Sequence, residues 1–490
     1  MAEERLEEIR AGRMQDRQSL LEAGKDPYPA EARRTHTSAE FEAAFSDLAA
    51  RAELVVVVGR LMGMRAHGGL VFLDIRDGSG TVQLQLVKDD VDPSFWELLD
   101  LLDVGDFIQV TGGAITTKRG TPTVLVKEFH IVSKSLRPLP DQWYGLRDHE
   151  LRFRQREVDL LLNDKAREVV LVRSKVMHLL RTYFTDQGYL EVETPTLQPI
   201  AGGAAAKPFS THHNALDMPL YMRIASELYL KRLLAGGYEK VFDLGFRFRN
   251  EGVSRQHNPE FTMLESQWAY ADYEDYMDFT ENIFTFLLEE ITGSTSLIWQ
   301  GTELHFAAPM IRKRYVDLVS ERLGVDILKD KNPETYMKLF QKEGLSMPTD
   351  HRYAKLVDEL YKELVRPEII QPTLLFDYPT EMAPLAKAKA SDPAVAEKFQ
   401  LVVCGKELVN AYTELNDPIE QRKLFEAQEK EFDDGNEEAQ KIDEVYLTAM
   451  EYGMPPNAGW GLGVDRLIML LTDSPSIRDT ILFPLLRSEK

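Results

Sequence analysis

The stretch from residue 241 to 270, VFDLGFRFRNEGVSRQHNPEFTMLESQWAY, most constrains the fold of this chain. Its first segment alternates apolar with charged positions: Phe242, Leu244, Phe246 and Phe248 against Arg247, Arg249 and Glu251. A period of two is typical of a strand with one buried and one polar face. After a polar loop a second run places Phe261, Glu265 and Gln267 on one face and Leu264 and Trp268 on the other. The pattern predicts an antiparallel hairpin whose polar face, with His257 in its loop, could hold one ligand.

Composition limits the class of protein. A length of 490 residues predicts roughly two or three domains. The proportions, 43% hydrophobic and 28% charged, are typical of a globular protein in water. The N-terminus MAEERLEEIR is too charged for a signal peptide, and no apolar run is long enough to cross a membrane. The single cysteine, Cys404, excludes an internal disulfide and a cysteine-built zinc site and fits a reducing compartment. We therefore expect a cytoplasmic protein without a membrane segment.

The formal net charge of -22 argues against a protein that coats nucleic acid, because phosphate affinity comes mostly from Lys and Arg. Local basic patches remain possible. The most basic one runs from Arg147 to Arg156, where the simple interpretation is a solvated face and the alternative is a contact with a phosphate backbone.

Turn and linker residues in the sequence predict four regions. We expect a helical extension over 1–50, a β-barrel over 51–140, a linker over 141–164 that follows Pro138 and Pro140, and a large domain over 165–490. The barrel region has short β-rich runs with a helical stretch between the second and third, which is typical of the OB fold. On it, Phe72 and Gln83 are candidates for contacts with unpaired bases, although a lone Phe in such a strand is more often core.

The large domain lacks a regular βαβ rhythm, which favours an α+β fold on an antiparallel sheet. Helices are expected near 165–187, 221–237 and 272–293, with mostly helical structure over 310–395. Strands are expected around the interruption at Pro195, over 399–416 and over 457–464, followed by a helix from about Asp465. Neither a GxxxxGK[ST] loop nor a GxGxxG fingerprint is present, so a nucleotide would bind without them.

Several ordered motifs point to one family. The Pro195 stretch, FRNE with HNPEF, and GLGVDR resemble the three motifs of class II aminoacyl-tRNA synthetases. The lysyl members are the most similar, because THHNALD, SELYLKRL, AYADY, AYTELNDP and ILFP occur in their order, from the N-terminal helix to the last residues. A chance match of so many ordered segments is far less probable than a match of any one.

The resemblance implies an antiparallel catalytic sheet of about six or seven strands, an N-terminal anticodon-binding OB barrel and a homodimer through the Pro195 region. It implies a lysine–tRNA ligase, which activates L-lysine with ATP and transfers it to the 3' end of tRNA(Lys). Enzymes of the family use magnesium on the phosphates, and Glu407 is the matching carboxylate.

The resemblance also assigns ATP contacts. Arg249 would bridge the carboxylate and the α-phosphate and neutralise the charge that gathers there. Glu251 would accept from the adenine amino group, Phe261 would stack under the ring and Arg466 would lie over it. The complete ATP set is Arg249, Asn250, Glu251, His257, Asn258, Phe261, Glu407, Leu408, Gly463 and Arg466.

For lysine, Glu227 and Glu265 match residues that hold the α-ammonium, and Glu414 matches the acid that pairs with the ε-ammonium. The complete lysine set is Gly203, Glu227, Arg249, Glu265, Gln267, Asn410, Tyr412 and Glu414. Glu407 has the opposite strand parity to Asn410, so one face for both requires a bulge near Asn410. In the barrel, Phe72, Gln83 and Glu128 match positions that read the central uridine of the anticodon.

Four positions depart from the family pattern: Gln267 for tyrosine, Gln400 for a metal carboxylate, Ser226 for proline, and Gln256 for arginine. We expect the first two to affect lysine selectivity and the number of bound metal ions, and Ser226 to matter little. Gln267 keeps a carbonyl acceptor but is also a donor.

Other functions remain open. A ligase with altered amino-acid selectivity, or a catalytically silent tRNA-binding scaffold, would fit Gln267 and Gln400. Relatives that lysylate a translation factor lack the barrel that this chain is predicted to have. A single-stranded nucleic-acid binder would leave the large domain unexplained.

Overall fold

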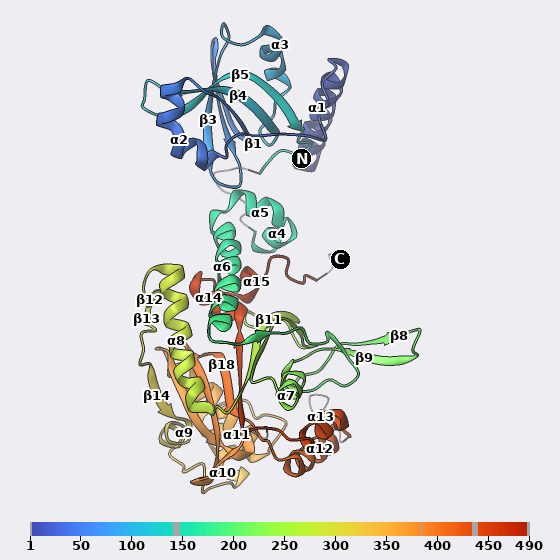
Figure 1. Ribbon diagram of the computed structural model, residues 1–490, viewed down its shortest axis with the longest axis vertical. Helices are drawn as coiled ribbons and strands as arrows, with labels where there is room; N and C mark the ends of the chain where they lie inside the picture. Colours follow the sequence, from blue (N-terminus) through green and yellow to red (C-terminus); the bar gives the residue numbers. More distant parts are fainter. Residues whose placement is uncertain (1, 141–147, 384, 434–439, 488–490) are drawn as a thin grey trace. The chain divides into compact units, whose positions relative to one another are not determined.

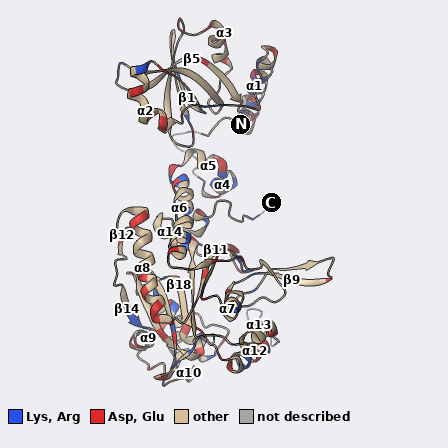
Figure 2. Ribbon diagram, in the orientation of Figure 1, with Lys and Arg blue, Asp and Glu red and all other residues tan. Residues whose placement is uncertain are grey.

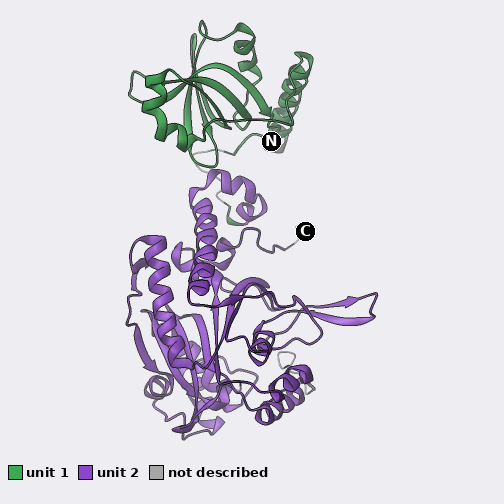
Figure 3. Cartoon of the chain, in the orientation of Figure 1, with its two compact units in different colours: residues 1–149 green, residues 150–490 purple. Residues whose placement is uncertain are grey.

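The computed structural model describes residues 2–140, 148–383, 385–433 and 440–487. The chain forms two compact units, residues 1–149 and 150–490 (Figure 3). Residues 141–147 of the predicted linker, and with them Arg147, lie outside the described residues. No helix in the described ranges is long and apolar enough to span a membrane.

The first unit is a closed barrel with two N-terminal helices, α1 Ala2–Glu22 and α2 Ser38–Arg51 (Figure 1). The strand order is β1-β2-β3-β5-β4. The strands are β1 Leu54–His67, β2 Leu70–Arg76, β3 Thr81–Val87, β4 Phe107–Thr116 and β5 Pro122–Ser133. A short helical segment, α3 Pro93–Glu97 with η1 Leu98–Leu101, separates β3 from β4. The predicted OB barrel is confirmed.

Alternation along the barrel strands separates core from surface. Leu73 and Leu84 are fully buried, whereas Phe72 and Gln83 have the opposite parity and are half-buried. The core interpretation of Phe72 is therefore wrong, because the strand period directs its ring away from the barrel interior. Arg13 of α1 is buried and donates to the carbonyl oxygens of Val104 and Arg137, so its role is structural.

The second unit is built on a sheet in the order β14-β15-β17-β18-β19-β11-β10-β6, with β16 paired to β17. Its strands are β6 Leu190–Glu191, β10 Lys240–Phe248, β11 Glu260–Ala269, β14 Ile311–Arg314, β15 Thr373–Pro379, β16 Ala388–Lys389, β17 Asp392–Val403, β18 Lys406–Thr413 and β19 Asn457–Gly463. Smaller sheets are made by β7 Leu197–Gln198, β8 Ser210–His213 and β9 Met218–Met222, and by β12 Ser296–Trp299 and β13 Thr302–His305. The sheet exceeds the expected size because β14 and β6 add parallel edge strands to an antiparallel centre.

Helices surround this sheet (Figure 1). The longer ones are α6 Asp164–Asp186, α8 Tyr273–Thr292, α10 Pro333–Glu343 and α12 Pro418–Asp433. The shorter ones are α4 His149–Arg154, α5 Arg156–Leu162, α7 Glu227–Ala235, α9 Tyr315–Leu323, α11 Tyr353–Leu360, η2 Tyr361–Val365, η3 Arg366–Glu368, η4 Thr380–Met382, α13 Glu444–Glu451, α14 Val464–Leu471 and α15 Ile477–Thr480. The predicted α+β class is confirmed.

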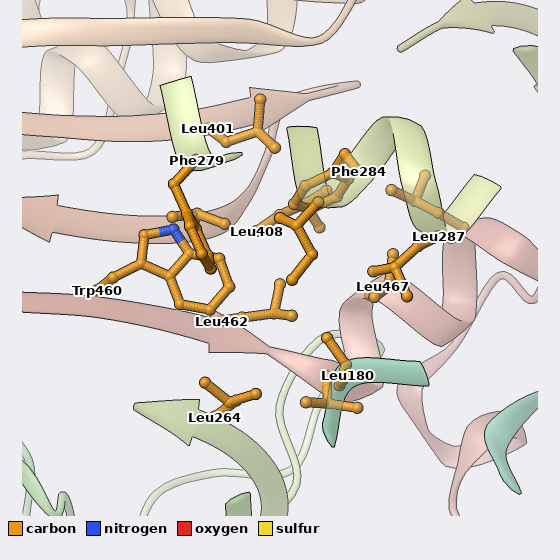
Figure 4. Close-up of a cluster of buried hydrophobic side chains, with 14 of the residues drawn as sticks. Leu180, Leu264, Phe279, Phe284, Leu287, Leu401, Leu408, Trp460, Leu462 and Leu467 are labelled. Carbon is orange, nitrogen blue, oxygen red and sulfur yellow. The ribbon is translucent and has the colours of Figure 1, made fainter. Parts of the chain in front are cut away.

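The large core lies between one face of the sheet and helices α6, α8 and α14. Figure 4 shows Phe279 and Phe284 of α8 gathered with Leu408, Trp460 and Leu462 of β18 and β19. α8 begins with a capping box of Asp272 and Asp275 and ends at Gly293. Acidic residues lie along α8 in Figure 2, so one stripe of the helix is apolar and another is charged.

Two sequence predictions for the strands were wrong in detail. The run 399–416 is not one strand but contains most of the β17–β18 hairpin, which turns at Cys404 and Gly405, both with positive φ. In β10, Phe246 is 49% exposed while Arg247 is fully buried. The alternation of the hairpin holds, but at this end of β10 the charged face is the covered one, because Asp243 of the same strand and Glu265 of β11 both pair with Arg247.

The barrel yields a stability prediction. A Cβ on Gly112 would overlap the Leu125 carbonyl oxygen and approach Val124 Cγ1 at 2.7 Å, whereas one on Gly113 would meet nothing within 4 Å. We expect Gly112→Ala to destabilise the barrel by about 1–3 kcal/mol through overpacking, and Gly113→Ala to have little effect. Hydrogen–deuterium exchange of the β4 and β5 amides should accelerate only in G112A. Equal exchange in the two variants would contradict this packing.

Candidate active site

Three adjacent strands form the floor of the site. Across β11, β19 and β18, one row of paired residues is Gln267, Gly459 and Tyr412. Two residues further along each strand, a second row is Glu265, Gly461 and Asn410. Glycine on the middle strand leaves space for the side chains on either side of it. A Cβ on Gly459 would overlap Glu414 Oε1 and lie 2.5 Å from Gln267 Nε2. Gly459 thus leaves room for the polar side chains of Glu414 and Gln267 on this face of the sheet.

The predicted bulge is present. Leu401 pairs with Val409 and Val402 with Glu407, so Leu408 is an extra residue on β18. This insertion reverses the strand parity and brings Glu407 to the face of Asn410. Gln400, which pairs with Asn410, donates from Nε2 to Glu407 Oε2 at 2.8 Å. Leu408 itself points into the core, so only its backbone can contact a ligand.

A buried ionic network that the sequence analysis did not anticipate lies under the hairpin. Arg247 donates from Nε to Glu265 Oε2 at 2.6 Å and pairs with Asp243 at 3.3 Å. Asp243 also pairs with Arg223 at 3.0 Å and accepts from the Thr194 hydroxyl at 2.6 Å. Burial alone would raise the pKa of Asp243, but its two arginines and Thr194 hold the pKa below its usual value. The shared parity of Asp243, Arg247 and Glu265 was the available sequence signal.

Ser226 contributes more than expected. Its backbone N–H donates to Glu265 Oε2 at 2.7 Å, and its hydroxyl lies 2.8 Å from that of Thr194. Proline, which the resemblance favours at this position, has no N–H to donate. The hydrogen bonds from Ser226 and Arg247 therefore both reach Glu265 Oε2.

A second buried cluster includes four of the predicted lysine-binding residues. Lys231 Nζ lies 2.5 Å from Glu227 Oε1 and 2.6 Å from Glu414 Oε2. Gln267 Nε2 donates to Glu414 Oε1 at 2.8 Å, and the Tyr412 hydroxyl donates to Glu227 Oε2 at 2.8 Å. Burial raises the pKa of Glu414 to about 8, although Lys231 acts to lower it. Lys231 was not among the predicted site residues, but its position one helical turn after Glu227 was a usable signal.

Gly203 lies at the edge of this cluster. Its φ of +84° is in the left-handed region, and a Cβ there would stand 3.0 Å from Glu227 Cβ. Its N–H donates to Gln440 Oε1 at 2.9 Å. Since Gln440 occupies the N–H, the backbone carbonyl is the group of Gly203 that remains for a ligand.

The other end of the site is cationic and aromatic. The Arg249 guanidinium lies 5.1 Å from the centre of the Phe261 ring. Arg466 donates from Nη1 to the Glu407 carbonyl oxygen at 2.9 Å, and its Nη2 lies 3.4 Å from His257 Nε2. Burial lowers the pKa of His257, and Arg466 lowers it further, so the imidazole is neutral at neutral pH.

Asp465 fixes the turn that carries Arg466. It accepts from the Thr262 N–H at 2.6 Å and from Arg173 Nη1 at 2.5 Å. These bonds attach the start of α14 to β11 and α6. Arg466 therefore projects from an anchored helix start close to Gly463, where a Cβ would lie 3.7 Å from its Cδ.

Several buried polar atoms of the site have no hydrogen-bond partner within the described chain. They are Arg249 Nε, Asn258 Oδ1, Gln267 Oε1 and Asn410 Oδ1. A buried polar atom without a partner is costly, so their convergence indicates a site built for a polar ligand. Asn250 and Glu251 are exposed where the chain leaves β10. The predicted anticodon residues lie in the other unit.

Comparison with known proteins identifies the family. A family model described as tRNA synthetases class II (D, K and N) matches residues 148–487. The chain belongs to this family. Within the first unit, residues 55–132 of this class II synthetase match a model described as OB-fold nucleic acid binding domain. The resemblance inferred from the sequence is confirmed.

The synthetase has close full-length relatives. It is 47% identical over 487 residues to the lysine–tRNA ligase of Pelotomaculum thermopropionicum, which covers 99% of this chain and 96% of that protein. It is 45% identical over 487 residues to the lysine–tRNA ligase of Carboxydothermus hydrogenoformans, with 99% of both chains covered.

The glycine floor of this class II synthetase provides a test. In Gly459→Ala the new methyl group would displace both Glu414 and Gln267, whereas in Gly461→Ala it would meet Met263 Cε at 2.8 Å, the end of a flexible side chain. We expect G459A to raise the KM for the amino acid in ATP–pyrophosphate exchange by roughly 10–100-fold, equivalent to about 1–3 kcal/mol of overpacking. G461A should change it far less. Similar KM values for the two variants would contradict the assigned pocket.

Proposed function

We propose that this class II synthetase is a lysine–tRNA ligase. The observation that carries the proposal is the buried Glu414 carboxylate at the end of a pocket that also contains Glu227 and Glu265. A buried acid binds a substrate ammonium and rejects neutral side chains of equal length, which would leave it unpaired. The full-length relatives named lysine–tRNA ligase support the same substrate.

Activation needs charge control at the α-phosphate. A lysine carboxylate oxygen attacks the α-phosphorus of ATP, a new P–O bond forms, and the bond to pyrophosphate breaks. Arg249, whose buried Nε has no hydrogen-bond partner among the described residues, would bind the carboxylate and the α-phosphate together and stabilise the added negative charge. Phe261 would support adenine from below while Arg249 holds the phosphate beside it. The aminoacyl group then passes to the terminal ribose of the tRNA.

The residues fit one magnesium site better than two. Glu407 offers a carboxylate, and magnesium bound to ATP phosphates needs only one or two protein carboxylates. Gln400 is engaged at both ends of its amide, since it donates to Glu407 and accepts from the Tyr378 hydroxyl at 2.9 Å. The described residues contain no group of three or more His, Cys, Asp or Glu side chains arranged to hold a metal ion. When bound with ATP, magnesium would neutralise phosphate charge.

The barrel is proposed to read the anticodon of tRNA(Lys). Phe72 and Gln83 lie on its outer face, half-buried, and Gln83 accepts from the Thr123 hydroxyl at 3.0 Å. Glu128 lies 2.6 Å from His130 Nε2. An aromatic ring beside fixed acceptors is how OB folds bind unpaired bases.

A homodimer through the Pro195 region is proposed as well. Leu190, Leu197 and Phe246 near it are each about half exposed. Such apolar side chains on edge elements are typical of a surface that a partner covers. The half-buried single cysteine, Cys404, supports a reducing compartment such as the cytoplasm.

Amino-acid-dependent ATP–pyrophosphate exchange tests the main proposal. Among the standard amino acids we expect lysine to support exchange, and Glu414→Gln to raise the lysine KM by roughly 30–150-fold, or about 2–3 kcal/mol for a lost buried ion pair. Glu303→Gln, at an exposed position of β13, is the matched control. Exchange with another amino acid but not lysine would overturn the substrate, and no exchange at all would favour a silent tRNA-binding scaffold.

The metal proposal predicts that the Gln400→Glu variant binds more metal ions than the wild-type protein. The new carboxylate faces Glu407 and creates a second acidic oxygen donor, so the enzyme–ATP complex should bind at least one additional Mn²⁺. Electron paramagnetic resonance titration with Mn²⁺ counts bound ions without relying on turnover. Equal ion counts in the wild-type protein and Q400E would contradict the limiting role of Gln400.

A further inference from the structure

The feature that the proposed reaction leaves unexplained is a lysine of the protein itself inside the lysine pocket. Lys231 has a side-chain exposure of 1%. Its ammonium contacts Glu227 from the same helix and Glu414, the residue just after β18, at 2.5 and 2.6 Å. Glu227 and Glu414 are, on the proposed function, the acids for the two ends of the substrate. One internal cation therefore connects both recognition groups.

The charges around Lys231 do not balance. The residues that face it are Glu227 of α7, Tyr412 of β18, Glu414 just after that strand and Tyr446 of α13. Gln267 of β11 joins the cluster through its hydrogen bond to Glu414. Glu265 is compensated separately by Arg247. Two carboxylates thus share one ammonium, and one negative charge is left. A second ammonium, brought by the substrate, would neutralise this remaining negative charge.

The oxygen positions show where the second ammonium fits. Lys231 lies against Glu414 Oε2, and Oε1 faces the Gln267 amide at 2.8 Å. Gln267 is 2% exposed, and its own Oε1 has no partner among the described residues. Rotation of this amide would present two oxygens, Glu414 Oε1 and Gln267 Oε1, to one ammonium.

We infer that Lys231 is a positioning residue that sets the charge and length of the amino acid this pocket accepts, namely one whose side chain ends in a primary ammonium. The inference rests on the proposed function. By holding Glu227 and Glu414 to one Nζ, Lys231 fixes the separation of the α-ammonium and side-chain acids. Because Lys231 compensates one of the two carboxylates, the pocket carries one uncompensated charge rather than two.

The electrostatic state follows from the same contacts. Burial opposes the charged form of Lys231, but Glu227 and Glu414 outweigh it and raise its pKa. Burial raises the pKa of Glu414 to about 8 even with Lys231 beside it. An ammonium binds the ionised carboxylate, so lysine affinity increases as pH rises toward this pKa and levels off above it. Without Lys231 the pKa of Glu414 rises further, and the pH at which lysine affinity levels off becomes higher.

The test is the lysine KM in ATP–pyrophosphate exchange between pH 6.5 and 8.5 for wild type, Lys231→Met, Lys231→Arg and Lys423→Met. K423M is the matched control, because Lys423 pairs with Glu420 at 2.6 Å on an exposed stretch of α12. For K231M we expect a lysine KM at least about tenfold higher at pH 6.5, since well below both pKa values one unit of pKa is a factor of ten, and a KM that is still falling at pH 8.5. The ATP KM should stay within about twofold, and K423M should match wild type.

K231R keeps the charge but replaces the compact ammonium by a planar fork that spaces the carboxylates differently. It should retain the wild-type pH profile and change the ratio of lysine to ornithine KM by more than about threefold. If K231M does not fold by thermal melting, K231R carries the test. A folded K231M with the wild-type pH profile, or a K231R with wild-type discrimination, overturns the inference alone. A wild-type enzyme without lysine-dependent exchange overturns the proposed function too.

Discussion

The active-site half of the sheet depends on the buried ion pair between Arg247 and Glu265. They lie on adjacent strands with almost no exposure, and these buried charges are tolerated because Arg247 compensates Glu265 and also pairs with Asp243. Thr194 extends this network to the segment before Pro195, and Ser226 extends it to the start of α7. A single arginine therefore aligns the hairpin, the edge segment and the helix that carries Glu227. Loss of this charge would leave Glu265 without its ion pair inside the sheet, while Asp243 would keep its pair with Arg223.

The polar side chains of the site fit together because the middle strand carries glycines on this face. β19 runs between β11 and β18, and Gly459 and Gly461 leave room for Gln267, Glu414 and Asn410. On its other face the same strand contributes Trp460 and Leu462 to the core (Figure 4). Strand alternation thus places a tightly packed apolar layer directly beneath a polar site. A rigid support of this kind keeps recognition groups in fixed positions.

Two positions show how far sequence reasoning reached. The parity conflict between Glu407 and Asn410 required a bulge, and the extra residue proved to be Leu408. Parity likewise grouped Glu265 with Gln267. The same rule failed to say which face of β10 is buried at Arg247, because burial depends on what the neighbouring strands place opposite it. Ser226 was expected to matter little, whereas its backbone N–H and its hydroxyl both join the network.

The sequence alone determined the class of fold, the OB barrel and the family, because hydrophobic periods, turn residues and ordered motifs are local properties. It also predicted site roles for Arg249, Phe261, Glu414 and Arg466, through the family motifs in which these residues stand. Only the tertiary structure revealed that Lys231 contacts Glu414 and that Gln440 occupies the N–H of Gly203. These pairs are separated by more than 180 residues, and no local pattern encodes which distant carboxylate a buried ammonium will meet.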